Sequence, residues 1–110
     1  MSEFFSSDIV RETMHSLADM QDKLITQIIY LPYFTDVQKK EHLQLMKSFL
    51  EKQKILYFRM SLSNDPEAIA TRNAVIESAK LFGLLENQGM VEFFDLLTAS
   101  IDKLEKSLDL

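Results

Sequence analysis

Paired acids and histidines at helical spacing are the first residues in this chain that could do chemistry. Glu12 and His15 form an E-x-x-H pair, which places both side chains on one helical face, as in di-iron carboxylate bundles. Such a site needs a second pair of this kind and further inward-facing carboxylates. The other histidine, His42, has Lys39 where the glutamate would stand. The pattern therefore favours a solvated helix face over a metal site, and we expect neither a metal nor another cofactor.

A second acidic pair, Glu92 and Asp95, has the E-x-x-D spacing of half a magnesium site in all-α nucleotide pyrophosphohydrolases. The matching upstream E-x-x-E pair is absent, because each upstream glutamate has a non-acidic residue three positions on. The sequence also lacks cysteine, a G-x-S-x-G elbow and a glycine-rich phosphate loop. We therefore expect a protein that is not an enzyme.

A row of lysines is the best indication of an anionic partner. Lys40, Lys47 and Lys54 are seven residues apart and so lie along one helical face, in a segment (35–62) with six Lys and Arg against three Asp and Glu. Glu51 lies on the same face and can pair with its neighbours. The whole chain carries a net charge of -5, which repels phosphate backbones. A small nucleic-acid-associated regulator that uses this basic face is therefore kept only as the alternative function.

The apolar periodicity predicts four helices that would position these residues, at about 7–30, 36–62, 66–82 and 88–108. The first has a wide apolar stripe, made of Val10, Met14, Leu17, Leu24 and Ile28 and extended by Ile9, Met20, Ile25 and Ile29. Few glycines and prolines interrupt the pattern, and no segment predicts a strand pair.

Local signals set the helix ends. Ser6 is the expected cap of the first helix, and Pro32 ends that helix. A T-x-x-Q capping box at Thr35 begins the second helix, and Asp65 before a proline caps the third. Gly83 is the expected closing residue of the third helix. For the fourth, the expected cap is Asn87.

Short connections between long helices favour antiparallel neighbours, so we predict an all-α fold, in one domain spanning residues 1–110. The predicted architecture is a four-helix up-and-down bundle, or helical hairpins that a partner chain completes. The second form arises because the third helix is shorter and poorer in large apolar side chains than the others. It would fill one corner of a bundle incompletely.

Two apolar features indicate a contact surface. The last helix places apolar residues at alternating steps of four and three, which suits packing along its length within the chain or between copies. The connection YLPYF is apolar where a solvated loop is usually polar. The predicted interface residues are Phe94, Leu97, Ile101, Leu104, Tyr33 and Phe34.

The composition indicates in which cellular compartment the protein is expected. A chain of 110 residues without cysteine gives no sign of an oxidising compartment, and no apolar run approaches the length of about 20 residues that a membrane span needs. The first residues lack the features of a signal peptide. We expect a cytoplasmic protein without a membrane partner.

Three stretches of the sequence resemble a family of short uncharacterised all-α proteins found mainly in cyanobacteria and in the phages that infect them. They are FF-S-DIV from Phe4 to Val10, FRMSLSND from Phe58 to Asp65, and FG at 82–83 followed by an apolar last helix that contains Met90. The resemblance implies an all-α fold of unknown function with no assigned catalytic residues, in the cytoplasm of a cyanobacterium or an infected cell.

Two features predict the function: the helices carry much apolar surface, and the sequence shows no recognisable arrangement of catalytic or metal-binding residues. We expect a non-enzymatic helical interaction or adaptor protein, which forms homo-oligomers and uses a helical face to bind another protein.

Overall fold

The computed structural model describes residues 3–81 and 89–108, and within these ranges it contains helices and no strands. The elements are α1 (Glu3–Ser6), α2 (Asp8–Tyr30), the 3-10 helix η1 (Leu31–Tyr33), α3 (Asp36–Leu62), α4 (Pro66–Leu81) and α5 (Met90–Leu108). The prediction of an all-α fold is confirmed, and the four long helices lie where the periodicity placed them. The predicted helix ends at 82 and 88, with Gly83 and Asn87, lie outside the described residues.

The turn from α2 into α3 follows the predicted local signals. Pro32 lies in η1, directly after α2. The Thr35 side chain accepts a hydrogen bond from the backbone N–H of Gln38 at 3.2 Å, and the Gln38 side chain accepts one from the backbone N–H of Thr35 at 2.9 Å. This reciprocal capping box satisfies two backbone donors that would otherwise have no partner.

Asp65 joins two parts of the chain that are far apart in sequence. Its Oδ1 accepts a hydrogen bond from the backbone N–H of Glu67 at 2.9 Å, which caps α4 as predicted. Its Oδ2 accepts one from the backbone N–H of Phe4 in α1 at 2.8 Å. One carboxylate therefore starts α4 and holds the first helix of the chain against it.

The start of the first long helix differs from the prediction by one residue. Ser6 lies inside α1, and Ser7 occupies the N-cap position of α2. The Ser7 side chain makes no capping hydrogen bond. The short helix α1 was not predicted, because its four residues are too few to show a helical period.

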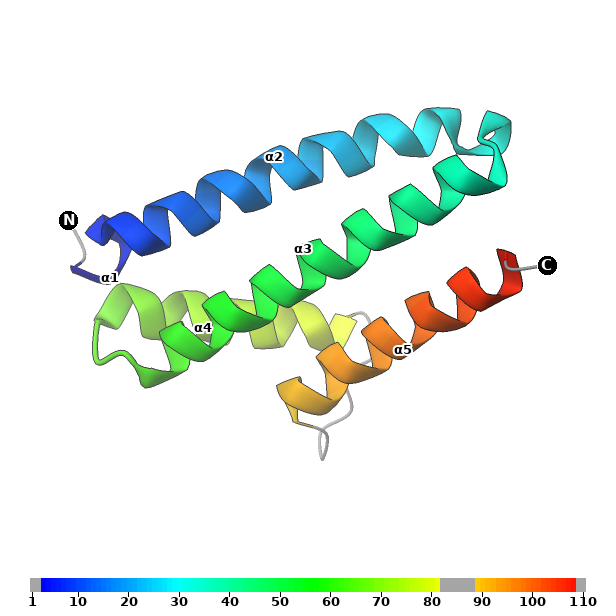
Figure 1. Cartoon of the computed structure of the whole chain (residues 1–110). Helices are drawn as coiled ribbons and strands as arrows, with labels where there is room; N and C mark the ends of the chain where they lie inside the picture. The colour runs from blue at the N-terminus through cyan, green and yellow to red at the C-terminus, as the bar shows by residue number, and fades with distance from the viewer. Residues whose placement is uncertain (1–2, 82–88, 109–110) are drawn as a thin grey trace.

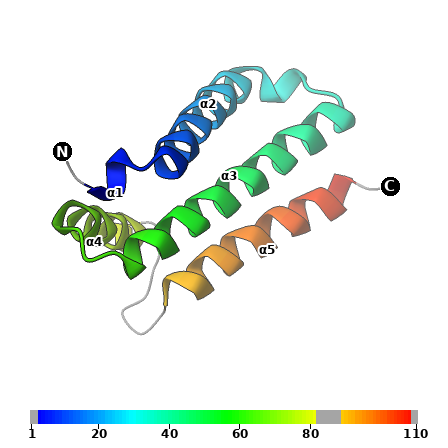
Figure 2. The ribbon, with the colours of Figure 1, turned by 60° about the vertical axis from the view of Figure 1, so that its left-hand side comes forward.

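Helix α3 lies at the centre of the arrangement. Figures 1 and 2 show α2 on one side of α3 and α5 on the other, both antiparallel to α3. Within the described residues, α3 packs extensively against α2, α4 and α5, whereas α2 and α5 make no extensive contact with each other. The chain is therefore supported by one shared helix rather than by four mutually packed ones.

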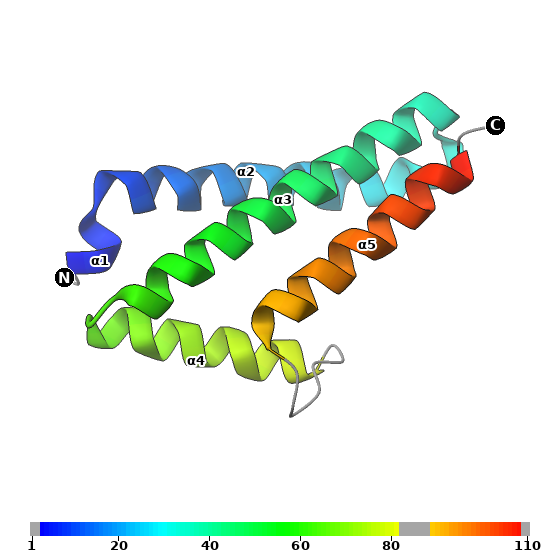
Figure 3. The same ribbon diagram turned by 60° about the horizontal axis from the view of Figure 1, so that its bottom comes forward.

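The lengths of the helices leave part of α3 without a fourth neighbour. With a rise of 1.5 Å per residue, the 27 residues of α3 span about 40 Å and the 16 residues of α4 about 24 Å. Figure 3 shows α4 against the C-terminal part of α3 only. Among the long helices of the described residues, α2 and α5 flank the N-terminal part of α3, and the corner opposite to α3 is incomplete there as predicted.

The core lies where α3, α4 and α5 meet. Ala79, Met90 and Phe94 are buried together, and the Tyr57 ring packs on the Phe94 ring with 6.2 Å between centroids. The radius of gyration is 15.7 Å, against about 13 Å for an average compact domain of this length. The chain is thus more open than a closed bundle.

Removing the Asp65 carboxylate tests the tie between α1 and α4. Because two hydrogen bonds are lost together, we expect Asp65→Ala to lower the free energy of unfolding by about 1–2 kcal/mol. Urea unfolding monitored by circular dichroism measures this change. Ser7→Ala is the matched control: it also removes an N-cap side chain, but one without a capping bond, so its cost should stay below about 0.5 kcal/mol. Equal costs for the two variants would contradict this role of Asp65.

Candidate interaction surface

An apolar groove runs along the N-terminal part of α3, between α2 and α5. It consists of two adjoining hollows with volumes of about 460 and 410 Å³. Both are lined by Ile28 of α2, by His42 and Met46 of α3, and by Leu104 of α5. We call this feature the α2–α5 groove. It lies in the corner of the bundle that α4 does not reach.

The wide apolar stripe of α2 explains why this side of the groove is exposed. The N-terminal part of the stripe packs inward, with Val10 buried and Leu17 partly buried. In its C-terminal part, Ile28, which lies on the same helical line as Val10, is 59% exposed, and Ile25 and Ile29, which widen the stripe, are 54% and 70% exposed. A stripe wider than one neighbouring helix can cover leaves apolar side chains in water, which usually marks a contact surface.

His42 provides the buried polar group in this apolar region. Its Nδ1 lies 2.7 Å from Oε1 of Gln27 on α2, and because the amide oxygen can only accept, Nδ1 carries the proton and donates. The Phe34 ring meets the imidazole edge to face, at 6.5 Å between centroids. Burial lowers the pKa of His42 below its ordinary value of 6.5.

The regularly spaced apolar residues of α5 are divided between the core and the groove. Phe94 and Ile101 are both buried within the chain, Phe94 in the core and Ile101 in the wall of the groove. Leu97 is partly buried and lines the groove, and Leu104 is 54% exposed at its rim. The regularly spaced apolar residues of α5 face α3, and from Leu97 onward they also line the groove.

The two predicted interface residues of the α2–α3 connection differ in their exposure to solvent. Tyr33 is 85% exposed and lines neither hollow of the groove, whereas Phe34 is partly buried against His42. The exposed row of Ile25, Ile28 and Ile29 was not predicted as a surface. The available signal was the width of the apolar stripe of α2.

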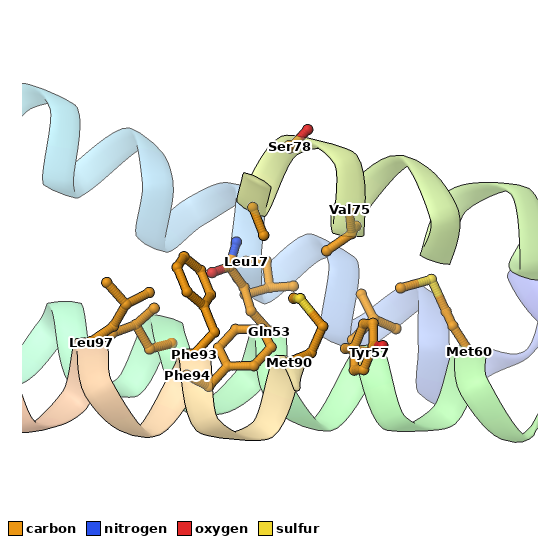
Figure 4. A pocket seen from close by; sticks show the side chains of 13 residues that line it. Leu17, Gln53, Tyr57, Met60, Val75, Ser78, Met90, Phe93, Phe94 and Leu97 are labelled. Atoms are coloured by element: carbon orange, nitrogen blue, oxygen red, sulfur yellow. The ribbon is translucent and has the colours of Figure 1, made fainter. Parts of the chain in front are cut away.

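A smaller cavity of about 330 Å³ lies where all four long helices approach one another. Figure 4 shows Leu17, Met90 and Phe93 extending into this space from α2 and α5, and Val75 from α4. The lining is mainly apolar, with Gln53 and Ser78 as its polar members besides Tyr57. This cavity continues the chain's own core rather than forming a second groove.

The predicted basic face of α3 pairs with α5. Lys47 Nζ lies 2.8 Å from Asp102 Oδ1 and 3.0 Å from Glu105 Oε1. Lys54 Nζ lies 3.4 Å from Asp95 Oδ1. From the sequence, Glu51 was expected to neutralise part of this row and acids of the flanking helices the remainder, and the acids that pair with Lys47 and Lys54 come from the flanking helix α5.

The spacing of these pairs matches the antiparallel packing of the two helices. The step from Lys47 to Lys54 is seven residues, and the step from Asp102 back to Asp95 is also seven. The hydrogen bond to Asp102, followed by that to Glu105, raises the pKa of Lys47 above its ordinary value of 10.5. The pairs therefore set the register between α3 and α5 and neutralise the centre of the basic row. Lys40, the first member of the row, is partly buried near the start of α3.

The acidic pairs considered for metal chemistry lie on the surface. Glu12 and His15 are exposed on α2, and Glu92 and Asp95 are exposed on α5. Residues 3–81 and 89–108 contain no group of three or more His, Asp or Glu side chains that could hold a metal ion. In the same ranges, no helix combines the length and the apolar character required to cross a membrane.

A family model described as a domain of unknown function (DUF1825) matches residues 2–108, nearly the whole chain. The chain belongs to this family. The resemblance to a family of unknown function is thus confirmed, while the cyanobacterial or phage setting stays a prediction. Neither a curated protein nor a solved structure matches the chain.

The buried imidazole predicts how stability depends on pH. Because the pKa of folded His42 is lowered, the unfolded chain binds the proton more readily, so the contribution of neutral His42 is lost as the pH falls below 6.5. The substitution His42→Asn keeps a donor toward Gln27 but cannot be protonated. Urea unfolding at about pH 7.5 and 5.5 should show a smaller loss of stability for this variant than for the parent. The exposed-site control, His15→Asn, should behave like the parent; equal pH dependence in all three proteins would contradict the role of His42.

Reversing one charge tests the register pairs. We expect Lys47→Glu to lower the urea midpoint, because the new carboxylate faces Asp102 and Glu105. Adding Asp102→Lys in the same chain should recover part of the loss, as a double-mutant cycle would measure. The control Lys52→Glu changes the net charge by the same amount at a partly buried neighbouring position. A midpoint for Lys47→Glu that equals that of the control would contradict the pairing.

Proposed function

We propose that this chain is a non-enzymatic helical interaction protein that self-associates in the cytoplasm. The observation that carries the proposal is the open α2–α5 groove, in which apolar side chains of three helices surround a corner that no helix of the described residues fills. Exposure of such an apolar surface to water is unfavourable, and a helix from another chain would cover it and complete the bundle. The composition, which lacks cysteine, gives no sign of an oxidising compartment.

The exposed area supports association on the scale of an obligate dimer. The chain of 12.8 kDa exposes 7804 Å², whereas an average folded monomer of that mass exposes about 6,300 Å². The excess is about 1,500 Å² per chain. Two copies that hid this area would bury about 3,000 Å² together, within the range of about 2,000–5,000 Å² that obligate homodimers bury.

The distribution of charge along the sequence also favours association through the α2–α5 groove. Residues 24–35 carry no Asp, Glu, Lys or Arg, and this is the longest such run in the sequence. It contains the part of α2 that lines the groove. Because each copy has a net charge of -5, association is easiest through a segment without charge, and interface cores are generally depleted of charged residues.

The alternative function, a regulator that binds nucleic acid through the basic face, has less support. Lys47 and Lys54 already have acidic partners on α5, so binding phosphates would require breaking those pairs. The acidic net charge adds repulsion. We therefore propose protein association and not nucleic-acid binding as the role of this chain.

The mass in solution tests the proposal. Sedimentation equilibrium at tens of micromolar should give twice the chain mass of 12.8 kDa. Dilution to nanomolar concentration should then return part of the material to the single-chain mass, because association depends on concentration. A single-chain mass at all concentrations, together with no binding of an apolar dye, would overturn the proposed function.

A further inference from the structure

We propose that the α2–α5 groove is occupied by α2 of a second copy, running antiparallel to the first α2, with the reciprocal insertion in the other copy. This inference rests on the proposed function and names the partner and the contact of that same site. The result is an isologous dimer, in which the same surface of each chain faces its own copy about a twofold axis.

The direction of the helices supports this geometry. Helices α2 and α5 both run antiparallel to α3, as Figures 1 and 2 show. In an up-and-down bundle each neighbour is antiparallel, so a helix that fills the corner between α2 and α5 must run opposite to both. A twofold axis perpendicular to α2 places the second α2 in that direction without any further adjustment.

The choice of α2 as the inserted helix follows from its exposed side chains. Along the C-terminal half of α2, Ile25, Ile28 and Ile29 are all more than half exposed. By contrast, Leu81 is the large apolar residue that α4 exposes within its described length. The α2 residues also border the groove through Ile28, so one segment supplies both the insert and one wall of the receiving site.

The α2–α5 groove and the inserted segment of α2 also match in their apolar character. The groove is lined mainly by leucine, isoleucine, methionine and phenylalanine, and the inserted segment lies in the charge-free run 24–35. Lys23 marks the end of that run and lies about 200° around the helix from Ile25, so it stays in solvent. A desolvated apolar centre with a charged rim is the usual anatomy of a stable interface.

Single cysteines test the contact directly, because the chain has no cysteine of its own. The variants Ile25→Cys, Ile28→Cys and Ile29→Cys place a thiol on the proposed contact, and Lys23→Cys is the control on the opposite side of the same helix. Under mild oxidation, two facing thiols lose their hydrogens to the oxidant and form a disulfide-linked dimer. We expect at least one of the three contact variants to cross-link at least about tenfold faster than the control. A control that cross-links as fast as all three would overturn the inference.

A charge in the groove gives the second readout. Because Ile28 is 59% exposed in the single chain, Ile28→Asp should keep the helical circular dichroism of the parent. We expect it to raise the dimer dissociation constant at least about 100-fold, since each copy would bury an unpaired carboxylate. Asp19→Asn, on an exposed part of α2, is the control and should leave the constant unchanged.

The outcomes separate the two proposals. If the parent has the single-chain mass, both self-association and the α2 contact are wrong. If the parent is a dimer but Ile28→Asp remains one and the contact cysteines do not cross-link, self-association stands and the α2 contact is wrong. A mass above two chains would overturn the isologous arrangement, because a closed twofold contact stops at two copies.

Discussion

The packing of α3 against α2, α4 and α5 is the interaction on which the rest of the structure depends. Since α2 and α5 meet extensively only through α3, the position of each is set by the face of α3 that it covers. Helix length limits this packing: α3 is 11 residues longer than α4, so α4 cannot cover the whole of α3. A central helix that is longer than one of its neighbours has part of its apolar surface only partly covered, and here Met46 and Phe49 lie in that part and line the α2–α5 groove.

Polar contacts of this protein specify the arrangement of the helices, while apolar contacts supply most of the driving force. The Asp65 carboxylate ties α1 to the start of α4. The bond between His42 and Gln27 links α3 to α2, and the pairs at Lys47 and Lys54 link α3 to α5. Because these groups have defined partners, they fix which turns of the helices meet. Apolar burial alone fixes this less well, since it has little directionality.

The helix boundaries could be predicted from the sequence because their causes are local. The Thr35 capping box and the Asp65 cap act within three residues of where they stand, so their patterns can be recognised without a fold. Ser7 shows the limit of this reasoning. A cap residue that makes no side-chain bond leaves no pattern that distinguishes it from Ser6 one position earlier.

The surface of the protein could be predicted only in part, because it depends on contacts distant in sequence. Asp102 pairs with a lysine 55 positions away, so the sequence could name the nearby Glu51 but not which acid of a flanking helix would pair. The seam of α5 was recognised as a packing face, but which of its turns are buried depends on where α4 lies. For the same reason Phe94 was assigned to an interface and is in the core. The incomplete corner itself was foreseeable, since the short length and poor apolar content of 66–82 are sequence properties.

Hydrogen exchange at two protein concentrations, above and below the dissociation constant of the dimer, tests the completion of this corner by a second chain most directly. Backbone amides exchange more slowly where tertiary or intersubunit packing suppresses local opening of a helix. We expect residues 24–31 and 97–108 to exchange faster on dilution, while residues 50–60, which α4 covers within the chain, keep their rates. Exchange in the first two segments that is independent of concentration would contradict the claim that the open corner is filled by another copy.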